Sequence, residues 1–259
     1  MSRAKLEIKD LTKCYARGAQ PPIKVVDRLS IEVQDQEFLA ILGPSGCGKS
    51  TFLRMIDGLI TPDSGSIVID GREVTGSVGG EGRGMVFQSF DLFPWRTVSG
   101  NVEFGLERLS LSRSERRDAA AHYIRLIGLE GFENAYPHEL SGGMQQRVGL
   151  ARALAIKPSI LLMDEPFGAL DVQTRDLLQD ELLRIWNGER KMVLFVTHSI
   201  EEALYLADRI IVITPRPARI DKIIDVPFAR PRDEGVKATS EFVELRQEIW
   251  HALKSGVHV

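Results

Sequence analysis

The amino-acid sequence predicts a layered α/β fold, on two observations. Short runs of β-branched and apolar residues recur along the chain, as expected for the strands of such a core. One run, 38–42, is almost fully apolar and ends at Gly43, which is typical of a strand buried on both faces that leads into a glycine-rich turn. A helix is expected next, over residues 49–58. The other strand-like runs are 67–69, 84–87, 160–163, 193–196 and 210–213.

Composition restricts the class of protein. The chain has 259 residues, of which 43% are hydrophobic and 27% are charged, as in soluble globular proteins. The formal net charge of −3 and the pI near 6.0 disfavour a nucleic-acid partner. Only Cys14 and Cys47 could form disulfides, which favours a reducing compartment. Residues 1–10 lack the apolar run of a secretory signal and no run reaches membrane-span length, so membrane association is expected to need a partner.

Segments outside the core show other patterns. Residues 5–9 and 29–33 alternate polar and apolar side chains, which predicts strands of an antiparallel edge sheet, with a loop at 18–22 between them. Helical periodicity at 114–127 and 141–155 predicts a mostly helical insertion. Beyond residue 214 a connector rich in proline and arginine precedes a last helix. Its apolar stripe is expected to pack on the core: Phe242, Leu245, Ile249, Trp250 and Leu253.

A phosphate-binding loop is predicted where strand 38–42 meets its helix. The segment matches G-x-x-x-x-G-K-[ST] in the strand-to-helix context that this motif requires. Glycines let backbone N–H groups turn toward phosphates, and the helix N-terminus adds partial positive charge. Lys49 is expected to neutralise the β and γ phosphates, Ser50 to coordinate Mg²⁺, and Thr51 either to contact the α-phosphate or to satisfy backbone. The loop is Gly43, Pro44, Ser45, Gly46, Cys47, Gly48, Lys49, Ser50 and Thr51, with Cys47 interpreted as a small filler residue.

Two carboxylates follow the buried run 160–163. Asp164 and Glu165 would be costly at a strand end unless a cation or water chemistry uses them. We expect Asp164 to support Mg²⁺ through water. Glu165 is the candidate base that orients the attacking water, while a merely structural carboxylate pair is the alternative.

These residues alone describe a P-loop nucleotidase, and the next motif narrows the class. The sequence LSGGMQQR at 140–147 resembles the signature of ATP-binding cassette (ABC) proteins. Ser141, Gly142 and Gly143 would open a helix whose free N–H groups form a second anion site, the alternative being an ordinary N-capped helix. In the family each ATP lies between the phosphate loop of one subunit and the signature helix of the other. The resemblance therefore implies a head-to-tail dimer, which we expect to be a homodimer.

The same resemblance assigns roles to further residues. Gln88 is similar to the family's Q-loop glutamine, which contacts Mg²⁺ or the water, and His198 to the switch histidine at the γ-phosphate. Asp171 corresponds to the loop that passes between subunits. Tyr15 resembles the aromatic residue that stacks on adenine, although an aromatic near a strand is more often core. Gln145, within the signature, is assigned to the nucleotide site with Ser141, Gly142 and Gly143.

The implied fold is an α/β P-loop NTPase core with an antiparallel β edge subdomain and a helical subdomain. We expect one ABC ATPase domain over residues 1–259. Its parts would be a RecA-like and antiparallel β core, a helical signature subdomain, and a C-terminal extension with an amphipathic helix. These parts are 1–89 with 157–214, 90–156, and 215–259.

The expected function is that of an importer ATPase. The stretches FPWRTVSGNVEFGL and FVTHSIEEALYLADRIIVITPRPARI look most like nitrate, sulfonate and taurine importer ATPases. Such a subunit uses ATP and Mg²⁺ at the cytoplasmic face of the inner or plasma membrane. It works with two transmembrane permease subunits and, indirectly, a solute-binding protein. Permease docking is expected at 90–96, through Pro94 and Trp95, with Trp95 as a core residue left open.

Other functions remain as alternatives. Soluble ABC ATPases of DNA repair or translation usually carry long insertions or two cassettes, and the sequence shows neither. Exporters share the cassette but often fuse it to membrane spans, whereas a P-loop kinase for a small molecule has no use for residues 140–145. The sequence does not indicate which solute is transported.

Overall fold

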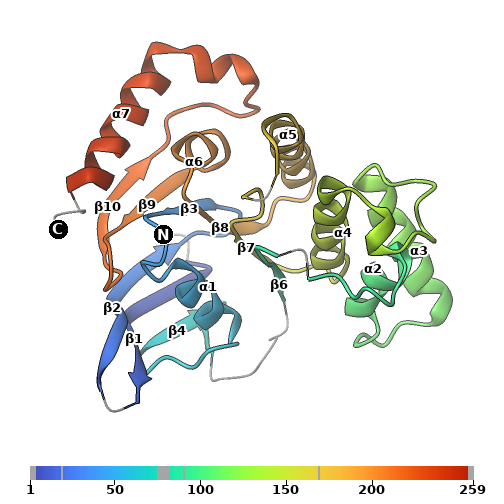
Figure 1. Cartoon of the computed structure of the whole chain (residues 1–259), viewed down its shortest axis with the longest axis horizontal. Helices are drawn as coiled ribbons and strands as arrows, with labels where there is room; N and C mark the ends of the chain where they lie inside the picture. Colours follow the sequence, from blue (N-terminus) through green and yellow to red (C-terminus); the bar gives the residue numbers. More distant parts are fainter. Residues whose placement is uncertain (1–3, 19, 75–81, 90, 169, 256–259) are drawn as a thin grey trace. The chain divides into compact units, whose positions relative to one another are not determined.

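The structure is a computed structural model that describes residues 4–18, 20–74, 82–89, 91–168 and 170–255 (Figure 1). Its contacts form two compact units. Unit 1 comprises Met1–Gly80 with Lys191–Val259, and unit 2 comprises Glu81–Arg190. The subdomain boundaries expected from the sequence stay predictions, and each unit is described by itself.

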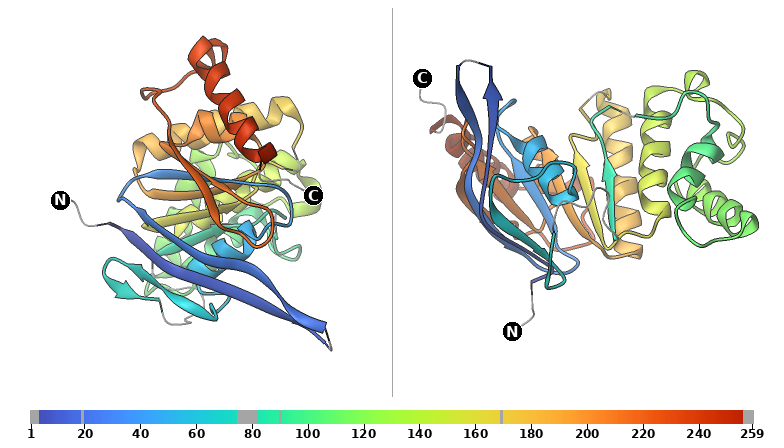
Figure 2. Two further views of the ribbon diagram at one scale, coloured as in Figure 1. Left: turned by 90° about the vertical axis from the view of Figure 1, so that its left-hand side faces the viewer. Right: turned by 90° about the horizontal axis from the view of Figure 1, so that it is seen from below.

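Unit 1 contains an antiparallel sheet of four strands in the order β2-β1-β4-β5. The expected loop at 18–22 is wrong for its second half, because Arg17 pairs with Gln20 and the strand runs through both prolines. Proline signals a loop, but it is tolerated here because β2 is an edge strand and donates fewer hydrogen bonds. Figure 2 shows the long hairpin of β1 and β2. The strands are β1 (Leu6–Arg17), β2 (Gln20–Val33), β4 (Ser64–Ile69) and β5 (Arg72–Glu73).

A second group of strands forms the core of unit 1. β3 (Phe38–Leu42) pairs in parallel with β8 (Met192–Thr197) and with β9 (Arg209–Ile213). Every residue of β3 and β8 is buried, which explains their continuous apolar sequence. β10 (Ile220–Asp225) pairs antiparallel with β9, so the expected connector after residue 214 contains a strand. The sequence hid it because charged residues interrupt its isoleucines and most of its side chains are exposed, so it has no continuous apolar run.

Helices α1 (Lys49–Asp57), α6 (Ile200–Leu206) and α7 (Ser240–Ser255) belong to unit 1. In α7 the expected apolar stripe packs in part, since Phe242 and Ile249 are buried and Phe242 stacks on Phe228 at 5.6 Å. Trp250, which was expected in the same stripe, is 51% exposed. The packed stripe is therefore narrower than the sequence pattern indicates.

Unit 2 combines a pair of parallel strands with helices. β6 (Arg83–Val86) pairs with β7 (Ile160–Asp164), all of whose residues are buried. The helices are α2 (Val98–Leu106), α3 (Arg113–Leu126), α4 (Gly142–Ala155) and α5 (Val172–Gly188), and a 3-10 turn spans Pro137–Glu139. In the described part of the chain, no helix has the length and apolar character needed to span a bilayer.

Candidate functional site

The phosphate loop of unit 1 lies between β3 and α1. β3 ends at Leu42, and α1 begins at Lys49 with Gly48 as its N-cap. Gly48 has φ 123°, a conformation that strongly favours glycine. The first turn of α1 holds no acidic residue, so its N–H groups and helix dipole favour an anion. The loop therefore has the features of a phosphate site.

Lys49 is fixed within this loop. Its side chain is 4% exposed, and its Nζ donates hydrogen bonds to the carbonyl oxygens of Gly43 at 2.7 Å and Pro44 at 3.0 Å. A buried ammonium group is stable only with such partners. The cation is thus held at the head of α1, where it can neutralise phosphate charge.

His198 lies at the same edge of unit 1 as the phosphate loop. Leu42 of β3 pairs in parallel with Thr197 of β8, so Gly43 and His198 each follow directly after this pair. The turn at His198 is held because Ser199 N donates to Thr197 Oγ1 at 3.0 Å, and Thr197 Oγ1 donates to Glu202 Oε2 at 2.5 Å. His198 is exposed, and the register places its backbone next to the start of the phosphate loop.

Tyr15 is an accessible aromatic on β1. Its ring is 37% exposed, and the ammonium of Lys13 lies 5.7 Å from the ring centroid. The side chain is therefore not a core residue. Its role against adenine stays a prediction.

In unit 2, Gln88, Asp164 and Glu165 lie at one edge of the β6–β7 pair. Val86 pairs with Met163, so the segments that carry these residues leave the two strands side by side. Asp164 is 2% exposed. Glu165 has φ 45°, an uncommon conformation for a residue with a side chain, and such residues cluster at functional sites.

The signature segment forms the start of α4. Ser141 caps the helix by accepting a hydrogen bond from Met144 N at 3.3 Å, and Ser141 and Gly142 are exposed. A Cβ at Gly143 would lie 2.5 Å from Thr174 Cγ2. Thr174 in turn donates from its N and Oγ1 to Asp171, at 3.0 and 2.7 Å.

Asp171 and the signature are thus joined through one threonine. Asp171 caps α5, and its hydrogen bonds with the Thr174 backbone and side chain hold the pKa of its carboxyl below the usual range. The Asp171 carboxylate therefore stays charged near neutral pH. The sequence suggested neither Thr174 nor its contact with Gly143.

Gln145 is placed differently from the other signature residues. Its side-chain amide donates to the carbonyl oxygens of Pro137 at 3.0 Å and Leu140 at 3.2 Å. These bonds hold the turn before α4. In this structure the amide group supports the signature loop from within the chain, so its assignment to the nucleotide rests on the sequence alone.

The donor set fits the expected cation. Ser50 supplies a hydroxyl, Gln88 an amide oxygen and Asp164 a carboxylate. Oxygen donors of this kind are those that Mg²⁺ prefers. Ser50 belongs to unit 1 and the other two residues to unit 2.

The segment expected to dock the permease, residues 90–96, has exposed side chains, and its backbone is bonded to a buried asparagine. Trp95 is 71% exposed, so the alternative of Trp95 as a core residue is wrong, and Phe90 lies outside the described residues. Asn101, which is fully buried, accepts from Phe93 N at 2.8 Å and donates to the carbonyl oxygens of Phe93 and Arg96. Sequence reasoning missed Asn101, because a lone asparagine in a helix gives no signal of its partners.

Arg152 of α4 also holds this segment. Its Nη1 donates to the Asp91 carbonyl at 2.7 Å, and its guanidinium lies 5.7 Å from the centroid of Phe93. Burial lowers the pKa of Arg152. The helix that begins with the signature is therefore tied to the segment after Gln88.

Comparison with known proteins gives matches along nearly the whole chain. A family profile described as ABC transporter matches residues 26–168. An uncharacterised ABC transporter ATP-binding protein of Methanocaldococcus jannaschii is 51% identical over 255 residues, covering 98% of this chain and 93% of the relative. The nitrate import ATP-binding protein of Synechocystis sp. is 44% identical, covering 96% of this chain and 95% of that protein. The taurine import ATP-binding protein of Rhizobium johnstonii is 47% identical, covering 96% and 97%.

A solved structure agrees with these sequences. It is a dimeric ATP-binding cassette in a post-hydrolysis state with ADP and Pi. Its TM-score is 0.76 at 34% identity, over 86% of this chain and 100% of that one.

Proposed function

The chain belongs to the ABC transporter family as an ATP-binding subunit with ATPase activity, and we propose that it powers the import of a small solute through separate membrane subunits. The observation that carries the proposal is the combination, in one chain, of a formed phosphate loop with a signature helix whose first residues, Ser141 and Gly142, are exposed. The names of its relatives support import. They do not favour the alternative of a soluble ABC ATPase outside transport.

In unit 1, the phosphate loop binds the triphosphate of ATP. Backbone N–H groups at the start of α1 bind the phosphate oxygens, and Lys49 neutralises the β and γ phosphates. His198 contacts the γ-phosphate from the neighbouring strand end, as the register of β3 with β8 supports. Tyr15 stacks on adenine from the exposed face of β1.

In unit 2, Glu165 orients and deprotonates the attacking water. Gln88 and Asp164 of this unit, with Ser50 of the phosphate loop, would hold Mg²⁺, which would supply positive charge to the phosphates. Gln88 also reports the state of the nucleotide to the docking segment that follows it.

The active unit is a head-to-tail homodimer. Ser141, Gly142 and Gly143 bind the γ-phosphate of ATP held by the partner's phosphate loop, and Asp171 lies between the two sites. The exposure of Ser141 and Gly142 at the start of α4 supports this assignment, because N–H groups in the first turn of a helix lack intrahelical partners and an accessible helix end can bind an anion. The dimeric cassette with ADP and Pi is a further support.

Two transmembrane permease subunits dock on the segment around Pro94 and Trp95, and a solute-binding protein delivers the solute to them. The chain then works at the cytoplasmic face of the inner or plasma membrane as a peripheral subunit. The exposed Trp95 supports docking, since an exposed tryptophan is typical of interfaces. Nitrate, a sulfonate, taurine or a related small solute is the proposed cargo, by analogy with the relatives.

The test is the molar mass of the Glu165→Gln variant by light scattering, with and without Mg·ATP. Loss of the base blocks hydrolysis while ATP binding persists, so we expect a shift from monomer to dimer that needs ATP. The double variant Glu165→Gln with Lys49→Ala is the matched control and should stay monomeric. A Glu165→Gln protein that hydrolyses ATP at the parent rate would show that the base is assigned wrongly.

A further inference from the structure

The turn between β9 and β10, residues 214–219, packs against the back of the phosphate loop. A Cβ added at Gly43 would lie 3.0 Å from the Ile213 carbonyl oxygen, and one at Gly48 would lie 3.4 Å from Ala218 Cβ. One at Gly46 would lie 3.7 Å from Arg216 Nη2. The glycines of the loop are therefore approached in order by the end of β9 and by the turn after it.

This turn is braced by its own hydrogen bonds. Thr214 N donates to the Arg219 carbonyl at 2.9 Å, and Arg219 N donates to Thr214 Oγ1 at 3.1 Å. Thr214 Oγ1 also donates to the Pro217 carbonyl at 3.0 Å. A turn closed in this way cannot change shape without losing several bonds at once.

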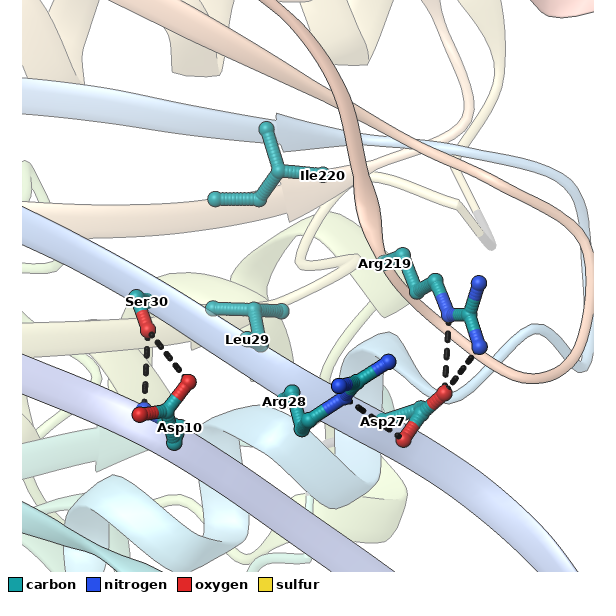
Figure 3. Close-up of a pocket in the computed structure, with 7 residues that line it drawn as sticks. All are labelled: Asp10, Asp27, Arg28, Leu29, Ser30, Arg219 and Ile220. Atoms are coloured by element: carbon teal, nitrogen blue, oxygen red, sulfur yellow. Dashed lines mark hydrogen bonds and ion pairs between the residues drawn. The ribbon is translucent and has the colours of Figure 1, made fainter.

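The turn is also anchored to β2. Ala218 N donates to the Val25 carbonyl at 2.8 Å, and Asp27 N donates to the Ala218 carbonyl at 3.0 Å. Arg219 donates from both Nε and Nη2 to one carboxylate oxygen of Asp27, Oδ2, and Asp27 is 3% exposed. Figure 3 shows this pair beside a cavity of about 390 Å³ that β1, β2 and the start of β10 line. The turn at 214–219, called the brace below, is therefore fixed to the antiparallel sheet as well as to β9.

Arg216 is the side chain that reaches from the brace to the loop. Its Nη2 donates to the Gly46 carbonyl at 2.7 Å. In a trans peptide the next N–H points opposite to the carbonyl, so this bond also sets the direction of Cys47 N. Cys47 N accordingly points across the loop, where it donates to the Pro44 carbonyl at 3.4 Å. Arg216 thus fixes the orientation of a peptide at the exposed tip of the phosphate loop.

We propose that Arg216 is a positioning residue for ATP, which holds the Gly46 peptide so that the phosphate loop keeps its binding shape before nucleotide arrives. The proposal rests on the assignment of this loop to the phosphates of ATP. The part of the chain that was expected to be a connector then belongs to the architecture of the nucleotide site. Arg216 lies outside residues 26–168, the stretch that the family profile matches.

The test compares ATP dissociation constants and steady-state rates of the parent, Arg216→Ala and Arg216→Lys. Loss of one hydrogen bond should raise the Kd of Arg216→Ala about threefold to tenfold. The kcat at saturating ATP should stay within about twofold of the parent, because preorganisation of the loop affects binding before chemistry. Arg216→Lys, which can donate the same bond, should bind ATP like the parent.

Arg72→Ala, which removes an exposed arginine of β5, is the matched control and should leave the Kd unchanged. Arg216→Ala with the Kd of this control would overturn the proposal, as would a loss confined to kcat. Equal losses in Arg216→Ala and Arg216→Lys would also contradict it. Thermal melts of each variant show whether the fold is kept.

Lys49→Ala separates this proposal from the proposed function. If Lys49→Ala binds ATP poorly and Arg216→Ala binds it normally, only the positioning role fails. If Lys49→Ala itself binds ATP like the parent, the assignment of the phosphate loop fails, and the role of Arg216 fails with it.

Discussion

The phosphate loop of unit 1 and the signature segment of unit 2 are both helix N-termini suited to an anion, but they are held differently. In the phosphate loop, Gly43 and Cys47 are buried, Lys49 is 4% exposed, and the turn at 214–219 packs behind the glycines. In the signature segment, Ser141 and Gly142 are exposed. Packing within unit 1 therefore determines the conformation of the phosphate loop, whereas the signature segment has its N-terminus exposed to solvent.

This difference separates two stages of one activity. A loop that the interior has already shaped can bind nucleotide within a single chain, because little ordering remains to oppose binding. In the proposed dimer, the exposed helix end forms a site with the phosphate loop of the partner. Changes in the phosphate loop should therefore affect ATP affinity, and changes at the signature should affect hydrolysis by the dimer.

The largest effect is expected from Lys49→Ala. It removes a buried cation with two hydrogen bonds, and charge-assisted bonds are strong, so ATP affinity should fall about tenfold to a hundredfold. Equilibrium binding of ATP to the monomer measures it. Lys9→Ala, on the exposed surface of β1, is the control. If the Kd of Lys49→Ala is within a factor of about two of the parent, the phosphate loop does not determine ATP affinity in the single chain.

Asn101→Ala tests whether the stability of unit 2 depends on buried hydrogen bonds that lie outside the signature segment. It leaves Phe93 N and several carbonyl groups without their buried partner, so the free energy of unfolding should fall by about 2 kcal/mol. Urea denaturation measures this change. Ser110→Ala, at an exposed position, should have almost no effect. Equal stability of the two variants would show that the bonds of Asn101 to Phe93 and Arg96 do not stabilise the unit.

Gly143→Ala tests the signature side. Its Cβ would overlap the Thr174 methyl group, so ATPase activity should fall about tenfold while ATP binding by the monomer is kept. Thr174→Ser removes that methyl group and keeps the hydroxyl bond to Asp171. Combined with Gly143→Ala, it should restore most of the activity. Failure of this rescue would assign the loss to something other than the Thr174 contact.

The smallest effect concerns Asp27, which anchors the brace of the phosphate loop. Hydrogen bonds from Arg219 and Lys24 lower the pKa of Asp27 below its ordinary value of 3.8. The stabilisation is then fully present above pH 3.8 and is lost as the pH falls through the lower, folded pKa. Asp27→Asn should be less stable than the parent at pH 7, and this difference should shrink in acid.

Urea midpoints at neutral and acid pH measure the Asp27 effect, with Asp35→Asn at an exposed position as the control. A difference between Asp27→Asn and the parent that does not change with pH would contradict the ionic role of Asp27.

Much of the fold could be predicted where burial alone determines the sequence. The run 38–42 coincides with β3, and the runs at 160–163 and 193–196 lie within β7 and β8, because strands buried on both faces need apolar residues throughout. β10 was missed because it is a largely exposed edge strand whose isoleucines are interrupted by charged residues, and its pairing depends on β9 rather than on its own sequence.

The candidate site was predictable to a different degree. Motif spacing placed Asp164, Glu165 and His198 at strand ends, where the structure has them. It could not indicate that the Gln145 amide bonds to its own chain, or that Arg216 reaches Gly46 across 170 residues of sequence. Contacts of this kind arise from packing between distant segments, and no local pattern encodes them.

Because Trp95 is exposed, its fluorescence can report whether a partner covers this part of the surface. The chain has three tryptophans, of which Trp186 is 4% exposed, Trp250 is 51% exposed and Trp95 is 71% exposed. Replacing Trp250 by phenylalanine would leave the Trp95 indole as the solvent-accessible emitter among them. Its fluorescence should shift to shorter wavelength and resist aqueous quenchers when a partner covers this surface, so that docking could be followed in real time without an attached dye.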